Sequence, residues 1–149
     1  MVVVTVFSLL AAVGCGDPPE QRLRDRIEEA RIAAEAGDIQ GLGEMLAEDY
    51  ADDHGNDRAT VVGMVGYYVR VEGGLHIWVR VDEMEITEPR KAQVRLLVAL
   101  AAGPIEKPQD LVQLRAEVHR FTLTMVEADP GDWLLRQASW ERASVADVL

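Results

Sequence analysis

The sequence predicts an α+β domain in which three N-terminal helices pack on one face of a strongly curved antiparallel sheet. Apolar residues first recur at a helical period of about 3.6, and after Gly73-Gly74 they alternate at a period of 2. The alternating segments exceed the usual strand length of about 5 or 6 residues and slip phase inside, which is typical of bulged and therefore bent strands. With 149 residues, the chain has the length of one ordinary domain.

Three segments before the period changes have the pattern of amphipathic helices. The first covers 20–36 and ends at Gly37, and the second covers 38–46 with Asp38 as its N-cap. The third runs from Asp57 to about Val71. The apolar stripes of the first two helices are Leu23, Ile27, Ala30 and Ala34, and Ile39, Leu42, Met45 and Leu46.

Four alternating segments follow, and they predict a four-strand antiparallel meander. One slip of phase near Asp82-Glu83 and another at His119-Arg120 predict bulges. A bent sheet over helices would enclose a conical cavity. The four segments are 76–86, 94–100, 112–125 and 133–141.

The start of the chain has the composition of a secretory signal peptide. Residues 2–14 are uncharged and mainly apolar, too short to span a membrane but long enough for the core of a signal. Small residues precede Cys15, the only cysteine, and this junction resembles the lipobox of bacterial lipoproteins, with Ala12 where that family prefers Leu. The alternative is a free cysteine at the end of a buried apolar strand.

The lipoprotein resemblance implies a particular division of the chain and a location. Residues 1–14 would be the signal peptide, 15–19 a lipidated tether and 20–149 the domain. Acylation of Cys15 would hold the protein on the inner or outer membrane of a bacterial cell envelope, facing the periplasm. The membrane is therefore one expected partner.

Charge and motif content exclude several other classes. With 26 Asp and Glu against 15 Lys and Arg, the formal net charge is −11, which repels nucleic acid. We expect no metal, because a single cysteine cannot build a thiolate zinc site and the acidic run 49–57 lacks the spacing of a calcium loop. We also expect no cofactor, because Gly41-Leu42-Gly43 lacks the third glycine of a dinucleotide fingerprint.

Four features of the sequence are the order of elements, the joint at 36–38, the segment Tyr50-Ala51-Asp52-Asp53 and the closing strand from Trp133 to Trp140. With these features the chain resembles the nuclear transport factor 2-like superfamily over residues 20–143. The resemblance implies a cone-shaped cavity. It also places Asp53 where ketosteroid isomerase-like members have their general base. Those members donate to the oxyanion from a tyrosine in the first helix, and this chain has none there, which disfavours enolising chemistry.

Two sets of side chains are candidate sites. An outer sheet face with an exposed tryptophan among charges has the composition of an interface, and the resemblance implies a homodimer across it. The alternative is that Trp78 is covered by its own chain. The candidate pocket residues are Tyr50, Asp53, Tyr67 and Trp140, and the candidate interface residues are Trp78, Arg80, Arg95, Arg115 and Glu117, with His76 and His119 on the same face.

These observations favour a lipid-anchored, non-catalytic binding or scaffolding domain that takes a small apolar ligand in its cone or binds a partner protein. One alternative is an enzyme of the isomerase or cyclase type with Asp53 as general base. A further alternative is an immunity-type protein that blocks a toxin through its acidic surface. The fold by itself does not choose among them.

Overall fold

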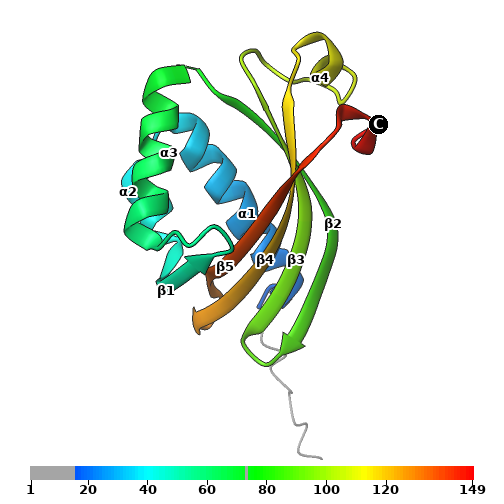
Figure 1. The fold of residues 1–149 in the computed structure, drawn as a ribbon. Coiled ribbons are helices and arrows are strands. Elements are labelled where there is room, and N and C mark those ends of the chain that lie inside the picture. The colour runs from blue at the N-terminus through cyan, green and yellow to red at the C-terminus, as the bar shows by residue number, and fades with distance from the viewer. Residues whose placement is uncertain (1–15, 73) are drawn as a thin grey trace, which may run out of the picture.

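The computed structural model describes residues 16–72 and 74–149. The expected signal peptide, 1–14, and the expected acylation site, Cys15, lie outside these residues. Among the residues described, no helix combines the length and the apolar character that crossing a membrane requires. Figure 1 shows helices on one side of a bent sheet, so the predicted α+β class is confirmed.

Each of the first three helices begins or ends at the polar or glycine residue that the sequence indicated. Helix α1, Pro19–Ala36, ends at Gly37, whose φ of 70° places it in the left-handed region. Helix α2, Ile39–Glu44, begins after Asp38, whose carboxylate accepts the N–H of Gly41 at 2.9 Å. Helix α3, Arg58–Glu72, follows Asp57, which accepts the N–H of Thr60 at 2.8 Å.

The second helix is shorter than predicted, and a strand follows it. Helix α2 ends at Glu44, and strand β1 covers Leu46–Asp52. Met45 and Leu46 therefore do not belong to the helix. Strand β1 pairs in parallel with the last strand of the chain. The predicted four-strand meander is thus a five-stranded sheet in which one edge pairing is parallel.

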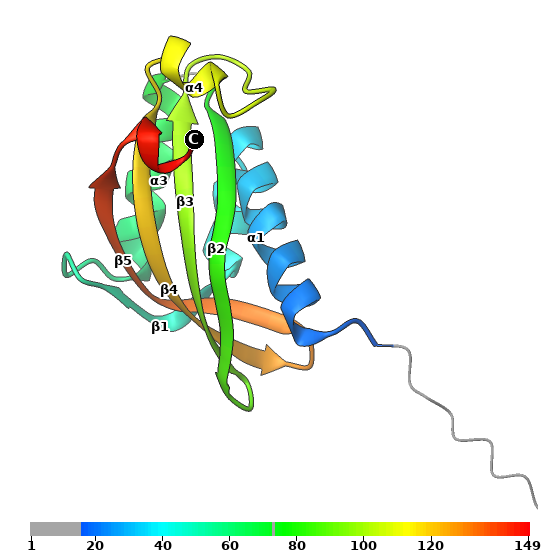
Figure 2. The same cartoon turned by 90° about the vertical axis from the view of Figure 1, so that its right-hand side faces the viewer.

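The sheet has the order β1-β5-β4-β3-β2. All pairings except that of β1 are antiparallel, as the meander predicted. The strands bend across the helices, and α1 lies beside the β2 edge (Figures 1 and 2). The remaining strands are β2 His76–Glu88, β3 Lys91–Ala101, β4 Glu117–Asp129 and β5 Asp132–Ala143.

Of the two predicted slips of phase, the first is confirmed and the second is wrong. The β2–β3 register shifts between Val81 and Glu83. At His119-Arg120 the pairing of β4 runs without a shift. The segment before β4 forms a short helix, α4, Asp110–Gln113, and not the start of a long strand.

Both faces of the sheet are covered, each over a different part. On the concave face, α1 contributes Leu23 to a core that includes Val94 and Trp133. On the outer face, a second cluster joins Leu97 of β3 to Leu111 of α4. Leu23, Leu97 and Leu111 are all fully buried. The outer cluster closes only the end of the sheet nearest α4 (Figure 2).

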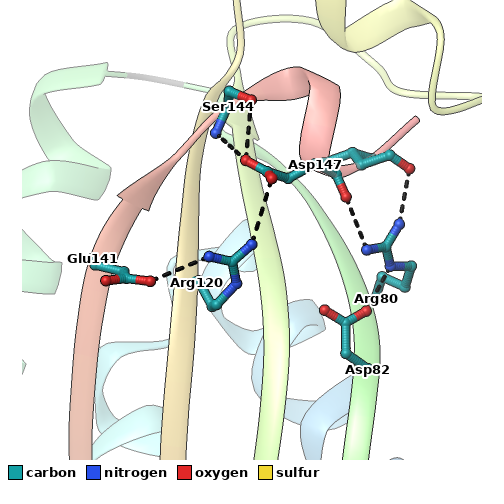
Figure 3. A network of polar contacts seen from close by, with 7 residues as sticks. Arg80, Asp82, Arg120, Glu141, Ser144 and Asp147 are labelled. Atoms are coloured by element: carbon teal, nitrogen blue, oxygen red, sulfur yellow. Dashed lines mark hydrogen bonds and ion pairs between the residues drawn. The ribbon is translucent and has the colours of Figure 1, made fainter.

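A network of arginines fixes the last residues of the chain to this outer face (Figure 3). Arg80 of β2 donates to the backbone oxygens of Asp147 and Val148 at 2.9 and 2.8 Å. Arg120 of β4 forms ion pairs with Asp147 and Glu141. Asp147 belongs to the short 3-10 helix η1, Val145–Asp147, which therefore lies across the outer cluster.

Candidate functional site

A cavity of about 460 Å³ lies between α3 and the concave face of the sheet. The inward side of α3 supplies valines and a tyrosine, and β4 and β5 supply rings from the other side. Met64 of α3 lines the same cavity and is 50% exposed, so the cavity reaches the surface beside α3. We call it the aromatic compartment after its rings, which are Tyr50, Tyr68, His119, Phe121 and Trp140.

A second cavity of about 320 Å³ continues from the first toward α1. The two cavities share six lining residues, among them Ala34 and Leu135, so they adjoin. Apart from Phe121, the second cavity is lined by no aromatic ring among the described residues. We call it the aliphatic compartment after Ile27, Ile77, Val79, Leu96, Val98 and Met125.

The rings of the aromatic compartment support one another. Trp140 stacks on His54 with ring centroids 4.2 Å apart and on Phe121 with centroids 5.8 Å apart. Phe121 and Trp140 are directly paired residues of β4 and β5. His119 approaches Phe121 edge-on at 6.5 Å. Because neighbours fix them, these rings form a stiff wall and lose little entropy when a ligand packs on them.

Tyr50 lines this compartment and is almost fully buried. It is 4% exposed, and its hydroxyl lies 3.4 Å from a carboxylate oxygen of Asp52. Burial, followed by the Asp52 charge, raises the pKa of Tyr50 well above its ordinary value, so the phenol stays protonated. Tyr50 therefore presents a neutral surface.

Asp52 organises the turn after β1. Its carboxylate accepts the backbone N–H groups of His54 and Asn56, both at 2.9 Å, and the side-chain amide of Asn56. Burial acts to raise the pKa of Asp52, but these hydrogen bonds outweigh it and hold the pKa below its ordinary value. The group works as a structural anion.

Asp53, the candidate general base, points away from the cone. Its side chain is 51% exposed, and one oxygen lies 2.8 Å from Nδ1 of His54. It lines a separate shallow hollow with Thr122 and Gln137 and not the aromatic compartment. A carboxylate there cannot abstract a proton from a molecule inside the cavity.

The same turn holds the one group of potential metal ligands among the described residues. Ligand atoms of Asp52, Asp53 and His54 lie within 4.8 Å of one another. The carboxylate of Asp52 already accepts a hydrogen bond from the backbone of the turn, and His54 stacks on Trp140. These contacts account for the positions of Asp52 and His54 without a cation.

Of the four predicted pocket residues, the structure places Tyr50 and Trp140 in the cavity. The other two lie outside it: Asp53 as described, and Tyr67 on the outer side of α3 with 68% of its surface exposed. Its neighbour Tyr68 lines the cavity instead. His119, which was expected on the opposite face of the sheet, also lines the cavity.

The five candidate interface residues do not form one surface. Trp78 packs against the outer cluster, so its own chain partly covers it. Arg80 binds the end of the chain, and Arg95 pairs with Glu83. Arg115 lies before β4 with a φ of 50°, which corrects its expected place on a strand.

Glu117 also lies on the other face from that expected. It pairs directly with Leu100 of β3, which lines the aromatic compartment, and so does not lie beside Trp78. Near the same end of the sheet, Glu117 and Arg142 approach to 3.9 Å. His119 pairs with Arg142 across the strands, on the concave side.

Two arginines line the aliphatic compartment, and both have carboxylate partners. Arg26 pairs with Glu29 and Asp132. Arg31 pairs with Glu28 and Glu35, each at 2.6 Å. The hydrogen bond with Arg31 lowers the pKa of Glu28, and the same bond raises that of Arg31. The compartment thus offers an anionic ligand no unpaired cation among the described residues.

No protein-family model matches the sequence, and no curated protein matches it. Solved structures do match it. A putative scytalone dehydratase from Novosphingobium aromaticivorans is similar with a TM-score of 0.68 at 12% identity, covering 84% of each chain. An NTF-2 like protein of unknown function from Pseudomonas aeruginosa gives 0.65 at 18% identity, over 83% of this chain and 99% of the other. Another, from Shewanella oneidensis, gives 0.64 at 12% identity, over 83% and 98%. Such identities bear on the fold alone.

Proposed function

The chain has a nuclear transport factor 2-like fold, and we propose that it is a lipid-anchored binding protein that holds a small, uncharged, apolar molecule in its cone. The observation that carries this proposal is the pair of adjoining apolar compartments, about 460 and 320 Å³ in volume. Both volumes lie in the range of about 300–1,000 Å³ that is typical of ligand sites.

An empty apolar space of this size favours the uptake of an apolar molecule from water. Side chains that line a void lose dispersion contacts on one side. A cavity of about 150 Å³ lined by apolar side chains stays dry and takes up benzene. The larger compartment here is several times that size, so an apolar ligand would restore many contacts and remove its own surface from water.

Membrane attachment fits this activity. The junction at Cys15 supports the anchor, and the stretch 15–18 that precedes α1 spans at most about 14 Å when fully extended. A domain held that close to a bilayer lies beside a reservoir of apolar molecules. The periplasmic location is part of the proposal and follows from the same lipobox resemblance.

A dye-binding experiment tests the proposal. The Cys15→Ser protein keeps every described residue and lacks the acylation site. We expect it to bind N-phenylnaphthylamine, an uncharged dye whose fluorescence rises in apolar surroundings. Ala34→Phe places a ring where the two compartments meet and should weaken binding by at least about tenfold, which corresponds to about 1.4 kcal/mol.

Ala36→Phe is the matched control, because Ala36 lies on the same helix and is exposed. It should leave the dye affinity unchanged. Absence of dye binding by the parent protein, or equal loss in both variants, would count against a ligand cavity in the cone.

A further inference from the structure

We infer that the ligand has two parts: a ring that carries one uncharged oxygen, held in the aromatic compartment, and an aliphatic chain that extends into the aliphatic compartment. This inference rests on the proposed function and specifies the class of molecule that the cone accepts. An alkylated phenol has this chemistry.

The first support is the uneven distribution of rings. The chain has only two Phe, three Trp and three Tyr. Four of these, Tyr50, Tyr68, Phe121 and Trp140, line the aromatic compartment. The aliphatic compartment shares Phe121 and otherwise presents branched and thioether side chains. Flat stiff walls favour a flat ring, whereas aliphatic side chains suit a flexible hydrocarbon.

The second support is continuity. The shared lining residues come from α1, α2, β1, β4 and β5, so they encircle the region where the compartments meet. Ala34 contributes only a methyl group there. A single ligand can therefore extend through the junction, and a compact ligand would leave one compartment empty.

The third support is the imidazole of His119, which has no hydrogen-bond partner among the described residues. His119 lines the aromatic compartment and contacts the ring of Phe121 edge-on, which leaves both of its ring nitrogens available to a ligand. Tyr50, by contrast, is directed to Asp52. A neutral imidazole offers one donor and one acceptor, so it can pair with a carbonyl or a hydroxyl oxygen of the ligand.

The same surroundings argue against a charged ligand. No Asp, Glu, Lys or Arg of the described chain lines the aromatic compartment, and the arginines of the other compartment already have carboxylate partners. Moving an ionised group from water into such a site is strongly unfavourable. The oxygen of the ligand is therefore uncharged.

Competition against N-phenylnaphthylamine in the Cys15→Ser protein tests both parts. The probes are naphthol, which has a ring only, octanol, which has a chain only, para-octylphenol, which has both, and octylbenzene, which lacks the oxygen. Each buried methylene contributes about fourfold in affinity, from about 0.8 kcal/mol. We expect octylphenol to bind at least tenfold more tightly than naphthol or octanol.

Two variants separate specific fit from general hydrophobicity. Ala30 lines only the aliphatic compartment, so Ala30→Phe should weaken octylphenol by about tenfold and leave naphthol within about twofold. Ala36→Phe on the same helix should change neither. His119→Leu should weaken octylphenol by about twofold to tenfold and spare octylbenzene, because only the phenol loses a hydrogen bond.

The outcomes distinguish this inference from the proposed function. If no apolar probe displaces the dye because no dye binds, both fail. If the dye binds but octylphenol is no tighter than naphthol, or Ala30→Phe weakens both equally, the two-part ligand is overturned while the binding function stands. Equal losses of octylphenol and octylbenzene in His119→Leu would overturn the role of His119 as the partner of the oxygen.

Discussion

Two adjacent alanines of α1 should respond in opposite ways to the same substitution. Ala34 lines both compartments, whereas Ala33 is 8% exposed and lines neither. Leucine adds three carbons at either position, and helix propensity changes equally because both alanines lie within α1. The difference in stability between the two variants therefore reports whether there is space beside each residue.

The expected magnitudes follow from the space available. At Ala34 the added carbons gain about 0.8 kcal/mol each by burial, and ordering the side chain costs about 0.5–1 kcal/mol. We expect a net stabilisation of about 1–2 kcal/mol, together with weaker dye binding. At Ala33 the leucine must displace packed neighbours, which costs about 1–3 kcal/mol.

Urea unfolding followed by tryptophan fluorescence measures both effects, and the chain has three tryptophans as reporters. An increase in the midpoint for Ala34→Leu and a decrease for Ala33→Leu, with unchanged slopes, are the expected results. If both variants are destabilised to the same extent, side chains fill the space beside Ala34 and the cavity argument fails.

Other substitutions test the remaining assignments. Cys15→Ser should move the protein to the soluble fraction and abolish fatty-acid labelling, and a labelled variant would disprove the lipid anchor. Asp53→Asn should change the free energy of unfolding by no more than about 0.5 kcal/mol and leave dye binding intact, whereas loss of a measurable turnover would restore the enzyme alternative. Trp78→Ala should lower the urea midpoint without changing the sedimentation coefficient, because Trp78 packs on its own chain; a dimer that dissociates would contradict this. Asp52 has a lowered pKa in the folded state, so its contribution to the free energy of unfolding is present above the ordinary carboxyl pKa of about 3.9 and is lost as pH falls through the folded pKa. The free energy of unfolding of Asp52→Asn should therefore depend less on pH across this range, and an unchanged dependence would disprove the contribution.

The helices and the sheet could be predicted because their signals are local. Gly37, Asp38 and Asp57 sit at helix boundaries whose caps depend on neighbouring residues, and all three work as expected. Strand β1 could not be predicted in this way. Its sequence, Leu46–Asp52, has no regular apolar alternation and includes three acidic residues, and its partner in β5 lies far along the chain.

The error at His119 has a definite physical cause. Val118 is buried in the outer cluster, while Phe121 faces the cavity, because α4 and η1 cover the outer face at that end. Apolar residues of both parities are therefore buried in one regular strand. If one face of the sheet is assumed to be exposed to solvent, apolar residues at both alternating positions indicate a slip of phase. That assumption assigns His119 and Glu117 to the wrong face.

The confusion of Tyr67 with Tyr68 arises from helix geometry. Adjacent residues on a helix differ by about 100° in direction, so one of the pair faces the cavity and the other faces solvent. The helix was predicted correctly, but the sequence contains apolar residues on both sides of it. Only the packing of α3 against α2 and β1 determines which tyrosine is inside.

The attachment of residues 145–148 to the outer face bears on how the chain folds during synthesis. Arg80 bonds to backbone oxygens 67 and 68 residues further along, and the cluster beneath needs Val148. While the ribosome is still producing β5, the apolar side chains of Trp78 and Leu97 have no cover from η1. Contacts between such distant parts of a chain form late and leave surfaces open to aggregation. The outer cluster can therefore be completed only after residues 145–148 have been synthesised and have docked on the sheet.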